Sequence, residues 1–107
     1  MHPEALRGHI DTMVLAALRP GPAHGYALVR DLATQSDGVF ELGEGTVYPS
    51  LHRLERDGLI ESTWTRHDGR RRRVYQLTRA GEAALSERHR DWRSFARGMN
   101  ALLEGSS

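Results

Sequence analysis

Apolar residues recur at helical spacing in four stretches of the chain. In residues 4–19 they follow an i, i+4, i+7, i+8 rhythm, which is typical of a helix that turns one stripe toward a core. Similar patterns predict helices over residues 24–36 and 44–57, and a longer one from residue 79 to residue 103. Pro20-Gly21-Pro22 ends the first helix, because neither proline can continue the backbone hydrogen-bond ladder.

The pattern changes to that of two strands between the third and fourth helices. Residues 59–66 and 71–77 are the predicted strands, and His67-Asp68-Gly69 forms a tight turn between them. Residues 39–42 predict a further short extended piece. Thr78 is a natural N-cap for the last helix, because its hydroxyl can accept a hydrogen bond from an unpaired backbone N–H.

The predicted order of elements is helix, helix, helix, β-hairpin and long helix. A mainly α fold with a small β-hairpin in this order is a winged helix-turn-helix. The 107 residues suffice for one core of ordinary size but not for two. We therefore expect residues 1–78 to form the winged helix-turn-helix domain and residues 79–107 a C-terminal helix and tail.

Composition narrows the class of protein further. The chain has no cysteine, which excludes a disulfide scaffold and a thiolate zinc site. It has no apolar run of transmembrane length and no signal-peptide pattern, so a cytoplasmic location away from membranes is expected. The six histidines form no i, i+4 pair, and neither a nucleotide-binding loop nor a nucleophile elbow occurs. No metal, cofactor or enzymatic activity is predicted.

Positive charge is concentrated in the predicted hairpin. The net charge is only +1, yet residues 66–79 contain six arginines and one acidic residue. Adjacent like charges repel one another, and a polyanion such as a nucleic acid would offset that repulsion. Alternation along a strand sends Arg70 and Arg72 to one face and Arg71 and Arg73 to the other. One of them could then pair internally with Glu55 or Asp57. A merely solvated charge run remains the alternative.

The outer face of the third predicted helix offers hydroxyls and long hydrogen-bond donors. Such groups suit phosphate oxygens and base edges, although an ordinary solvent-facing helix side remains the alternative. Gly43 and Gly45 leave the start of this helix uncrowded, so that its free N–H groups could approach a phosphate. Tyr48 has two open interpretations, a half-buried ring with its hydroxyl on a phosphate or a core residue. The other candidate contacts are Thr46, Ser50, His52, Arg53 and Arg56.

These segments together carry a family resemblance. The PadR family of bacterial transcriptional regulators has a signature that closely resembles residues 45–60, GTVYPSLHRLERDGLI. Three more segments resemble the same family: Leu6-Arg7-Gly8, His24-Gly25-Tyr26 and the stretch from Gly69 to Gly81. The resemblance covers about residues 6–92, and Gly43 departs from it, because members often have Ser or another capping residue there.

The resemblance implies a dimeric winged-helix repressor of transcription. Its third helix would enter the major groove of an inverted-repeat operator in double-stranded DNA, and its wing would grip the flanking minor groove or backbone. Carried over by position, the helix contacts would be Thr46, Tyr48, Pro49, Ser50, His52 and Arg53. The wing contacts would be Gly69, Arg70, Arg71 and Arg72, and Tyr26 would contact the DNA backbone.

The last predicted helix independently indicates a homodimer. Leu85, Trp92 and Met99 recur every seven residues, like the a positions of a coiled-coil heptad. Phe95 and Leu102 follow Trp92 and Met99 by three residues and occupy the d positions. A second copy of the chain would cover this stripe, although the helix could instead fold back on the first one.

Two of these stripe residues raise the question of a small-molecule effector. In short members of the resembled family, aromatic residues on this helix can line a cavity between subunits, so Trp92 and Phe95 could accept a planar or amphipathic compound. Interface packing without a ligand is equally open. Two rival functions also remain, a winged-helix module that docks on an acidic protein and a ligand sensor without specific DNA binding.

Overall fold

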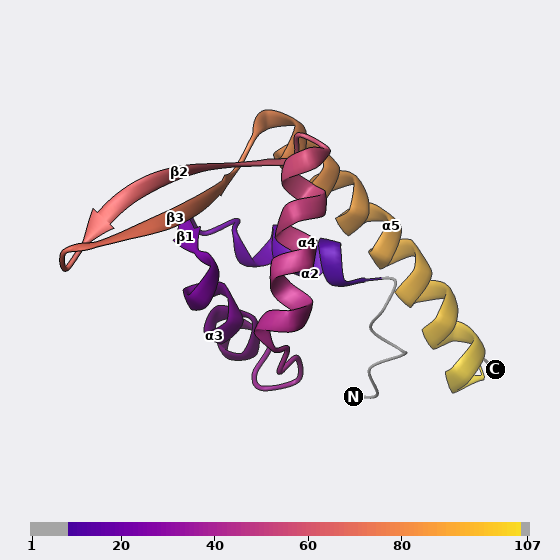
Figure 1. Ribbon diagram of the computed structural model, residues 1–107. Helices are drawn as coiled ribbons and strands as arrows, with labels where there is room; N and C mark the ends of the chain where they lie inside the picture. Colours follow the sequence, from indigo (N-terminus) through magenta and orange to yellow (C-terminus); the bar gives the residue numbers. More distant parts are fainter. Residues whose placement is uncertain (1–8, 106–107) are drawn as a thin grey trace.

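Helices and one small antiparallel sheet make up residues 9–105, the part of the chain that this computed structural model describes (Figure 1). The predicted order of helices, hairpin and long helix is confirmed. The predicted start of the first helix and the segment Leu6-Arg7-Gly8 lie outside the described residues. The elements are α2 (Ile10–Ala17), β1 (Ala23–His24), α3 (Gly25–Gln35), α4 (Glu44–Arg56), β2 (Ile60–His67), β3 (Arg70–Leu77) and α5 (Arg79–Glu104).

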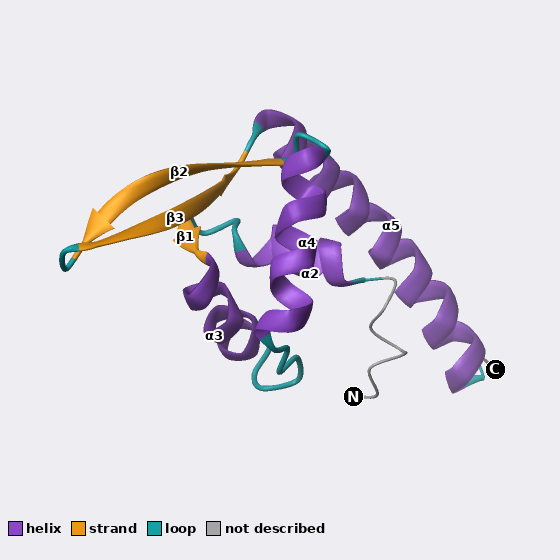
Figure 2. Ribbon diagram, viewed as in Figure 1, coloured by secondary structure: helices purple, strands orange, loops and turns teal. Residues whose placement is uncertain are grey.

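The hydrophobic core lies where α2, α3 and α4 meet the base of the sheet (Figure 2). The predicted stripe of α4, Val47, Leu51 and Leu54, is almost completely buried there. Ile60 and Tyr75 close the core from the sheet side. Because these side chains fix which side of α4 faces inward, they also decide which side faces solvent.

The sheet has three strands in the order β1-β3-β2, not the two that the sequence pattern predicts. β2 and β3 form the predicted hairpin around Asp68 and Gly69, whose φ angles of 51° and 75° suit a two-residue turn. β1 pairs only with the base of β3, so the hairpin extends beyond it as a free wing (Figure 1).

The segment at residues 39–42, predicted as a short extended piece, is not a strand of the sheet. The described chain has no strand there, and the third strand is Ala23–His24, directly before α3. Asp37 and Gly38 both have positive φ, and the N–H of Phe40 donates to the Ser36 hydroxyl at 3.0 Å. The two positive φ angles and this hydrogen bond turn the segment back onto the end of α3, so the segment does not reach the sheet.

α5 leaves the core soon after it begins. The predicted cap is confirmed, because the Thr78 hydroxyl accepts a hydrogen bond from the N–H of Gly81 at 3.0 Å. Of the predicted stripe, Leu85 packs against the core. The rest of it is exposed, by 51% for Trp92, 57% for Phe95, 37% for Met99 and 80% for Leu102, although the ring centres of Trp92 and His9 lie 5.5 Å apart in an edge-on contact.

We expect Gly81→Ala to lower the free energy of unfolding by about 3 kcal/mol. Gly81 is buried in the first turn of α5, and a Cβ there would collide with the carbonyl group of Leu59. Gly98→Ala in the same helix is the matched control, since a Cβ at Gly98 meets no atom within 4 Å. That control should gain up to about 1 kcal/mol from helix propensity. Equal stability of both variants in urea titrations would contradict the close approach of α5 to Leu59.

Candidate nucleic-acid interface

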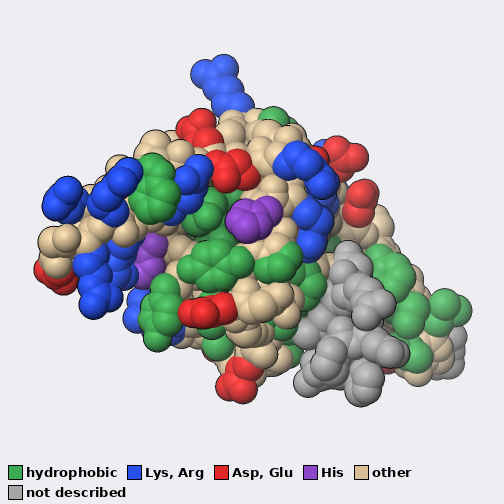
Figure 3. Space-filling view, in the orientation of Figure 1, with side chains coloured by type: hydrophobic (Ala, Val, Ile, Leu, Met, Phe, Trp, Pro, Cys, Tyr) green, Lys and Arg blue, Asp and Glu red, His purple; other side chains and the backbone are tan. Residues whose placement is uncertain are grey.

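α4 presents one exposed face beside the wing. Figure 3 shows the arginine side chains crowding the hairpin, with the body of the molecule next to it. The N-terminus of α4 has no side-chain cap, because Gly43 occupies the N-cap position. The predicted contacts that do lie on the exposed face of α4 are Thr46, Pro49, His52, Arg53 and Arg56.

Ser50 does not lie on this face, which corrects the prediction. Its side chain is fully buried, and its hydroxyl donates to Oδ1 of Asp11 at 2.7 Å. Its position explains the burial: Ser50 is three residues after Val47 and four before Leu54, on the flank of the core stripe. The hydroxyl therefore joins α4 to α2.

Two tyrosines border the start of α3. The Tyr48 ring is half-buried against Gly25, where a Cβ would come within 2.7 Å of Tyr48 Cε1. The ring also packs against the hydrophobic core, so its half-burial is compatible with both interpretations of Tyr48. Tyr26 lies in the first turn of α3 with 63% of its surface exposed.

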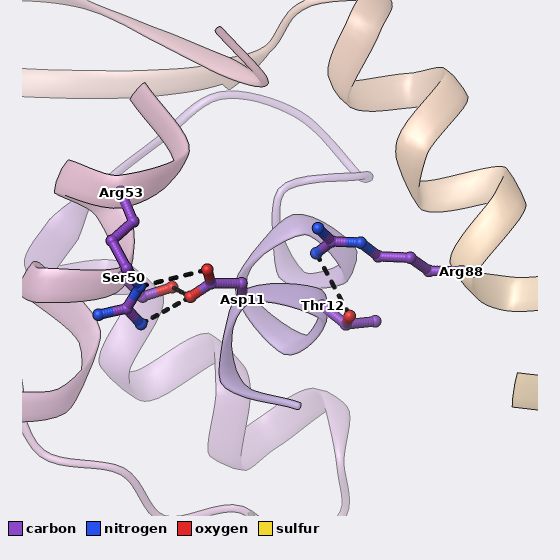
Figure 4. A network of polar contacts seen from close by, with 5 residues as sticks. All are labelled: Asp11, Thr12, Ser50, Arg53 and Arg88. Atoms are coloured by element: carbon purple, nitrogen blue, oxygen red, sulfur yellow. Dashed lines mark hydrogen bonds and ion pairs between the residues drawn. The ribbon is translucent and has the colours of Figure 1, made fainter. Parts of the chain in front are cut away.

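Asp11 connects α2 to two residues of α4 (Figure 4). Besides the Ser50 hydroxyl, it accepts hydrogen bonds from Arg53, with Nη2 at 2.7 Å from Oδ1 and Nε at 3.3 Å from Oδ2. Burial raises the pKa of Asp11, but the hydrogen bonds from Arg53 and Ser50 and the charges of Arg53 and Arg88 outweigh it and hold the pKa below its ordinary value. Asp11 is therefore a carboxylate at neutral pH.

The wing carries an exposed tryptophan between two arginines. The guanidinium carbons of Arg71 and Arg73 lie 4.8 and 5.1 Å from the centre of the Trp64 ring, within the range of cation–π contacts. Arg73 also reaches Glu55 of α4, with Nη2 3.9 Å from Oε2, which confirms the predicted internal pair. The predicted alternation is confirmed as well, because Arg72 points away from Trp64 and meets His24.

His24 joins α3 to the wing. Its Nδ1 accepts a hydrogen bond from the N–H of Ala27, and its Nε2 lies 3.2 Å from Nη1 of Arg72. A neutral imidazole has one acceptor nitrogen, so His24 serves only one of these donors at a time. Burial, together with the positive charges of Arg72 and Arg30, lowers the pKa of His24 and favours this neutral form.

The wing, the start of α3 and α4 together enclose one cleft of about 590 Å³. Aromatic and basic side chains dominate its lining, which suits a polyanion with planar bases. Within residues 9–105, no three metal-ligating side chains cluster, and no helix is both long and apolar enough to cross a bilayer. The lining residues are His24, Gly25, Tyr26, Tyr48, His52, Trp64, Tyr75 and Arg70 to Arg73.

Three residues of this region were missed by sequence reasoning. Asp11 and His24 act through partners far along the chain, and no local signal could have found those contacts. Trp64 had a usable signal, because its place opposite Arg73 in the hairpin follows from the predicted turn. The predicted dimer residues lie elsewhere, on α5, where the rings of Trp92 and Phe95 have their centres 5.6 Å apart.

This fold, with a basic wing beside an exposed helix, defines a winged-helix regulator. The sequence model of the PadR-like family of transcriptional regulators matches residues 14–87, and the chain belongs to this family. Members of the family are transcriptional regulators, not enzymes.

Three relatives illustrate the similarity. A Mycobacterium tuberculosis protein named as a transcriptional regulator is 39% identical over 88% of this chain and 85% of its own length. The crystal structure of a PadR family regulator from Eggerthella lenta has a TM-score of 0.82 at 36% identity, covering 96% of this chain and 88% of that one. Bacillus subtilis PadR, solved in complex with operator DNA, shares the fold with a TM-score of 0.66 at 23% identity, over 73% of this chain and 45% of that one.

We expect Asp11→Asn to lower the free energy of unfolding at pH 7 by about 1 kcal/mol, since Arg53 is 44% exposed and solvent screens the pair. The pKa of Asp11 is lower in the folded chain than in the unfolded one. The carboxylate therefore stabilises the fold at neutral pH, and this contribution disappears as the pH falls below about 4. Urea titrations should show that the variant loses less stability than the wild type on acidification.

Asp57→Asn is the matched control for this prediction. Asp57 pairs with Arg56 at 3.1 Å on the exposed surface, so the same substitution there should change stability by less than about 0.5 kcal/mol. An Asp11 variant that behaves like this control at both pH values would contradict the stabilising role of Asp11.

Proposed function

We propose that this chain is a sequence-specific regulator that binds an inverted-repeat operator in double-stranded DNA as a homodimer and represses transcription. The observation that carries the proposal is the cleft between the arginine wing and the start of α3, which Tyr48 and His52 line from α4 next to the exposed face of that helix. The operator complex of Bacillus subtilis PadR supports it, since that protein has the same fold.

Each part of the cleft has its own role in this proposal. The wing supplies long-range attraction to phosphate through Arg70, Arg71 and Arg72, with Gly69 at its tip. Tyr26, exposed at the start of α3, contacts the DNA backbone. The exposed face of α4 enters the major groove and reads base edges. Its contacts are Thr46, Tyr48, Pro49, His52 and Arg53, without Ser50.

α5 joins two copies of the chain and thereby sets the distance between two recognition helices. The exposed stripe of Trp92, Phe95, Met99 and Leu102, continued by Leu85, supports this role. Two helices about 34 Å apart would fit half-sites one turn of DNA apart. The division into residues 1–78 for DNA and 79–107 for dimerisation is part of the same proposal.

A planar or amphipathic effector would bind between the α5 helices. Trp92 and Phe95 support this, because they offer two adjacent aromatic rings that the single chain leaves exposed. A compound between them would release DNA by favouring another dimer geometry.

We expect wing and helix substitutions to have different effects on DNA binding. Arg70→Ala and Arg72→Ala should weaken binding to all duplexes and reduce the slope of log affinity against log salt by about 1 each. His52→Ala and Arg53→Ala should instead change sequence preference by about 1–3 kcal/mol at particular base pairs. Fluorescence anisotropy with the DNA upstream of the gene and a scrambled duplex measures both effects.

The same titrations separate the rival functions. If neither set of variants changes DNA affinity, the assignment of the two surfaces fails. If the wild type itself binds no DNA in a salt-dependent way, a protein-interaction module or a ligand sensor becomes the better explanation.

We expect Phe95→Glu to convert the dimer into monomers, because the substitution places a charge in the centre of an apolar stripe. Arg97→Glu is the control, since Arg97 is exposed on the opposite side of the same helix. Sedimentation equilibrium should give the mass of two chains for the control and of one chain for Phe95→Glu. A monomeric wild type would contradict the proposed dimer.

A further inference from the structure

Only one edge of the Arg53 guanidinium is occupied by contacts within residues 9–105. A guanidinium has five N–H donors, and Asp11 takes one from Nε and one from Nη2. Both donors of Nη1 and the second donor of Nη2 remain for another partner. Since the Arg53 side chain is 44% exposed, this terminal edge is accessible on the outer face of α4.

The carboxylate that holds Arg53 is itself held in place. Asp11 belongs to α2, which packs against the buried side of α4 in the hydrophobic core. The buried Ser50 hydroxyl donates to the same carboxylate and limits its rotation. A guanidinium bound in this way loses much of its conformational freedom before any ligand arrives, which reduces the entropic cost of binding.

Arg56, the next arginine of α4, lacks such support. Its partner is Asp57, the adjacent residue, and both side chains are more than half exposed. A surface pair of this kind is screened and mobile. Arg53 is thus the arginine of α4 whose orientation is set by a partner on another helix.

We propose that Asp11 is a positioning residue that presents Arg53 to one guanine in each half-site of the operator. The inference rests on the proposed entry of α4 into the major groove. Guanine offers its O6 and N7 acceptors side by side there, and two parallel guanidinium N–H groups match them. None of the other three bases offers two adjacent acceptors on this edge.

The charge of the pair favours a base over a phosphate as the partner of Arg53. The Asp11 carboxylate, 2.7 Å from Nη2, offsets the positive charge of Arg53. A neutralised pair attracts a phosphate weakly, but it keeps its directional N–H donors. Within residues 9–105, Arg70 to Arg73 of the wing have one carboxylate partner, Glu55, which pairs with Arg73. These arginines are therefore better suited to phosphate.

The test begins with sites that the wild-type protein selects from a randomised DNA duplex. Affinities are then measured for the selected duplex, for versions in which each G·C pair of a half-site is replaced, and for a scrambled duplex. The wild type should lose about tenfold or more in affinity at one guanine per half-site. Arg53→Ala should abolish this loss.

Asp11→Asn is the decisive variant. Its amide oxygen can still accept the Ser50 hydroxyl, so the fold is retained, as a urea titration would check. It should reduce guanine discrimination to less than about threefold, yet leave the affinity for the scrambled duplex unchanged or higher, because a negative charge has gone. A merely structural defect would lower the affinity for the selected duplex and the affinity for the scrambled duplex alike. Adding Asp11→Asn to Arg53→Ala should cause no further loss of guanine discrimination. The control Asp57→Asn should leave this discrimination intact.

Two results would overturn the inference without touching the proposed function. One is unchanged guanine discrimination in Asp11→Asn. The other is an Arg53→Ala variant that weakens binding to all duplexes equally, which would make Arg53 a phosphate contact. A wild-type protein that selects no site at all would overturn both the inference and the proposed function.

Discussion

The burial of one side of α4 is the constraint on which the rest of the structure depends. Val47, Leu51 and Leu54 fix the rotation of this helix, and replacing one such leucine by alanine typically costs about 2–5 kcal/mol. Polar contacts then hold both flanks of α4. On one flank, Asp11 of α2 accepts a hydrogen bond from Ser50, and on the other, Ser62 of β2 donates one to Glu55. The remaining side of α4 therefore projects into solvent at a defined angle to the wing.

The wing shows how a concentration of like charge is accommodated in a small fold. Arg73 is held by Glu55 and Trp64, and Arg71 lies over the same indole ring. Among the described residues, the guanidinium of Arg72 has only the neutral His24 as a partner. The fold thus compensates part of the positive charge of the wing. The remaining charge lies at the rim of the cleft, where a phosphate backbone would neutralise it.

Features set by neighbouring residues could be predicted from the sequence. The stripes of α4 and α5, the Asp68-Gly69 turn and the Thr78 cap all follow from local spacing or turn chemistry, and the structure has each of them. Long-range contacts could not be predicted. Ser50 has the spacing of a residue at the edge of a helix face, and only its partner Asp11, 39 residues away, decides that it is buried. β1 is likewise too short to carry a strand pattern of its own.

The most direct test of the account is to follow backbone amide NMR signals while the selected operator duplex is added. The account predicts that the largest shifts occur along the exposed face of α4, at Tyr26 and at Arg70 to Arg72. The signals of Val14 and Leu28 in the core should stay in place. Shifts confined to α5, with none on α4 or the wing, would contradict the claim that this cleft binds DNA.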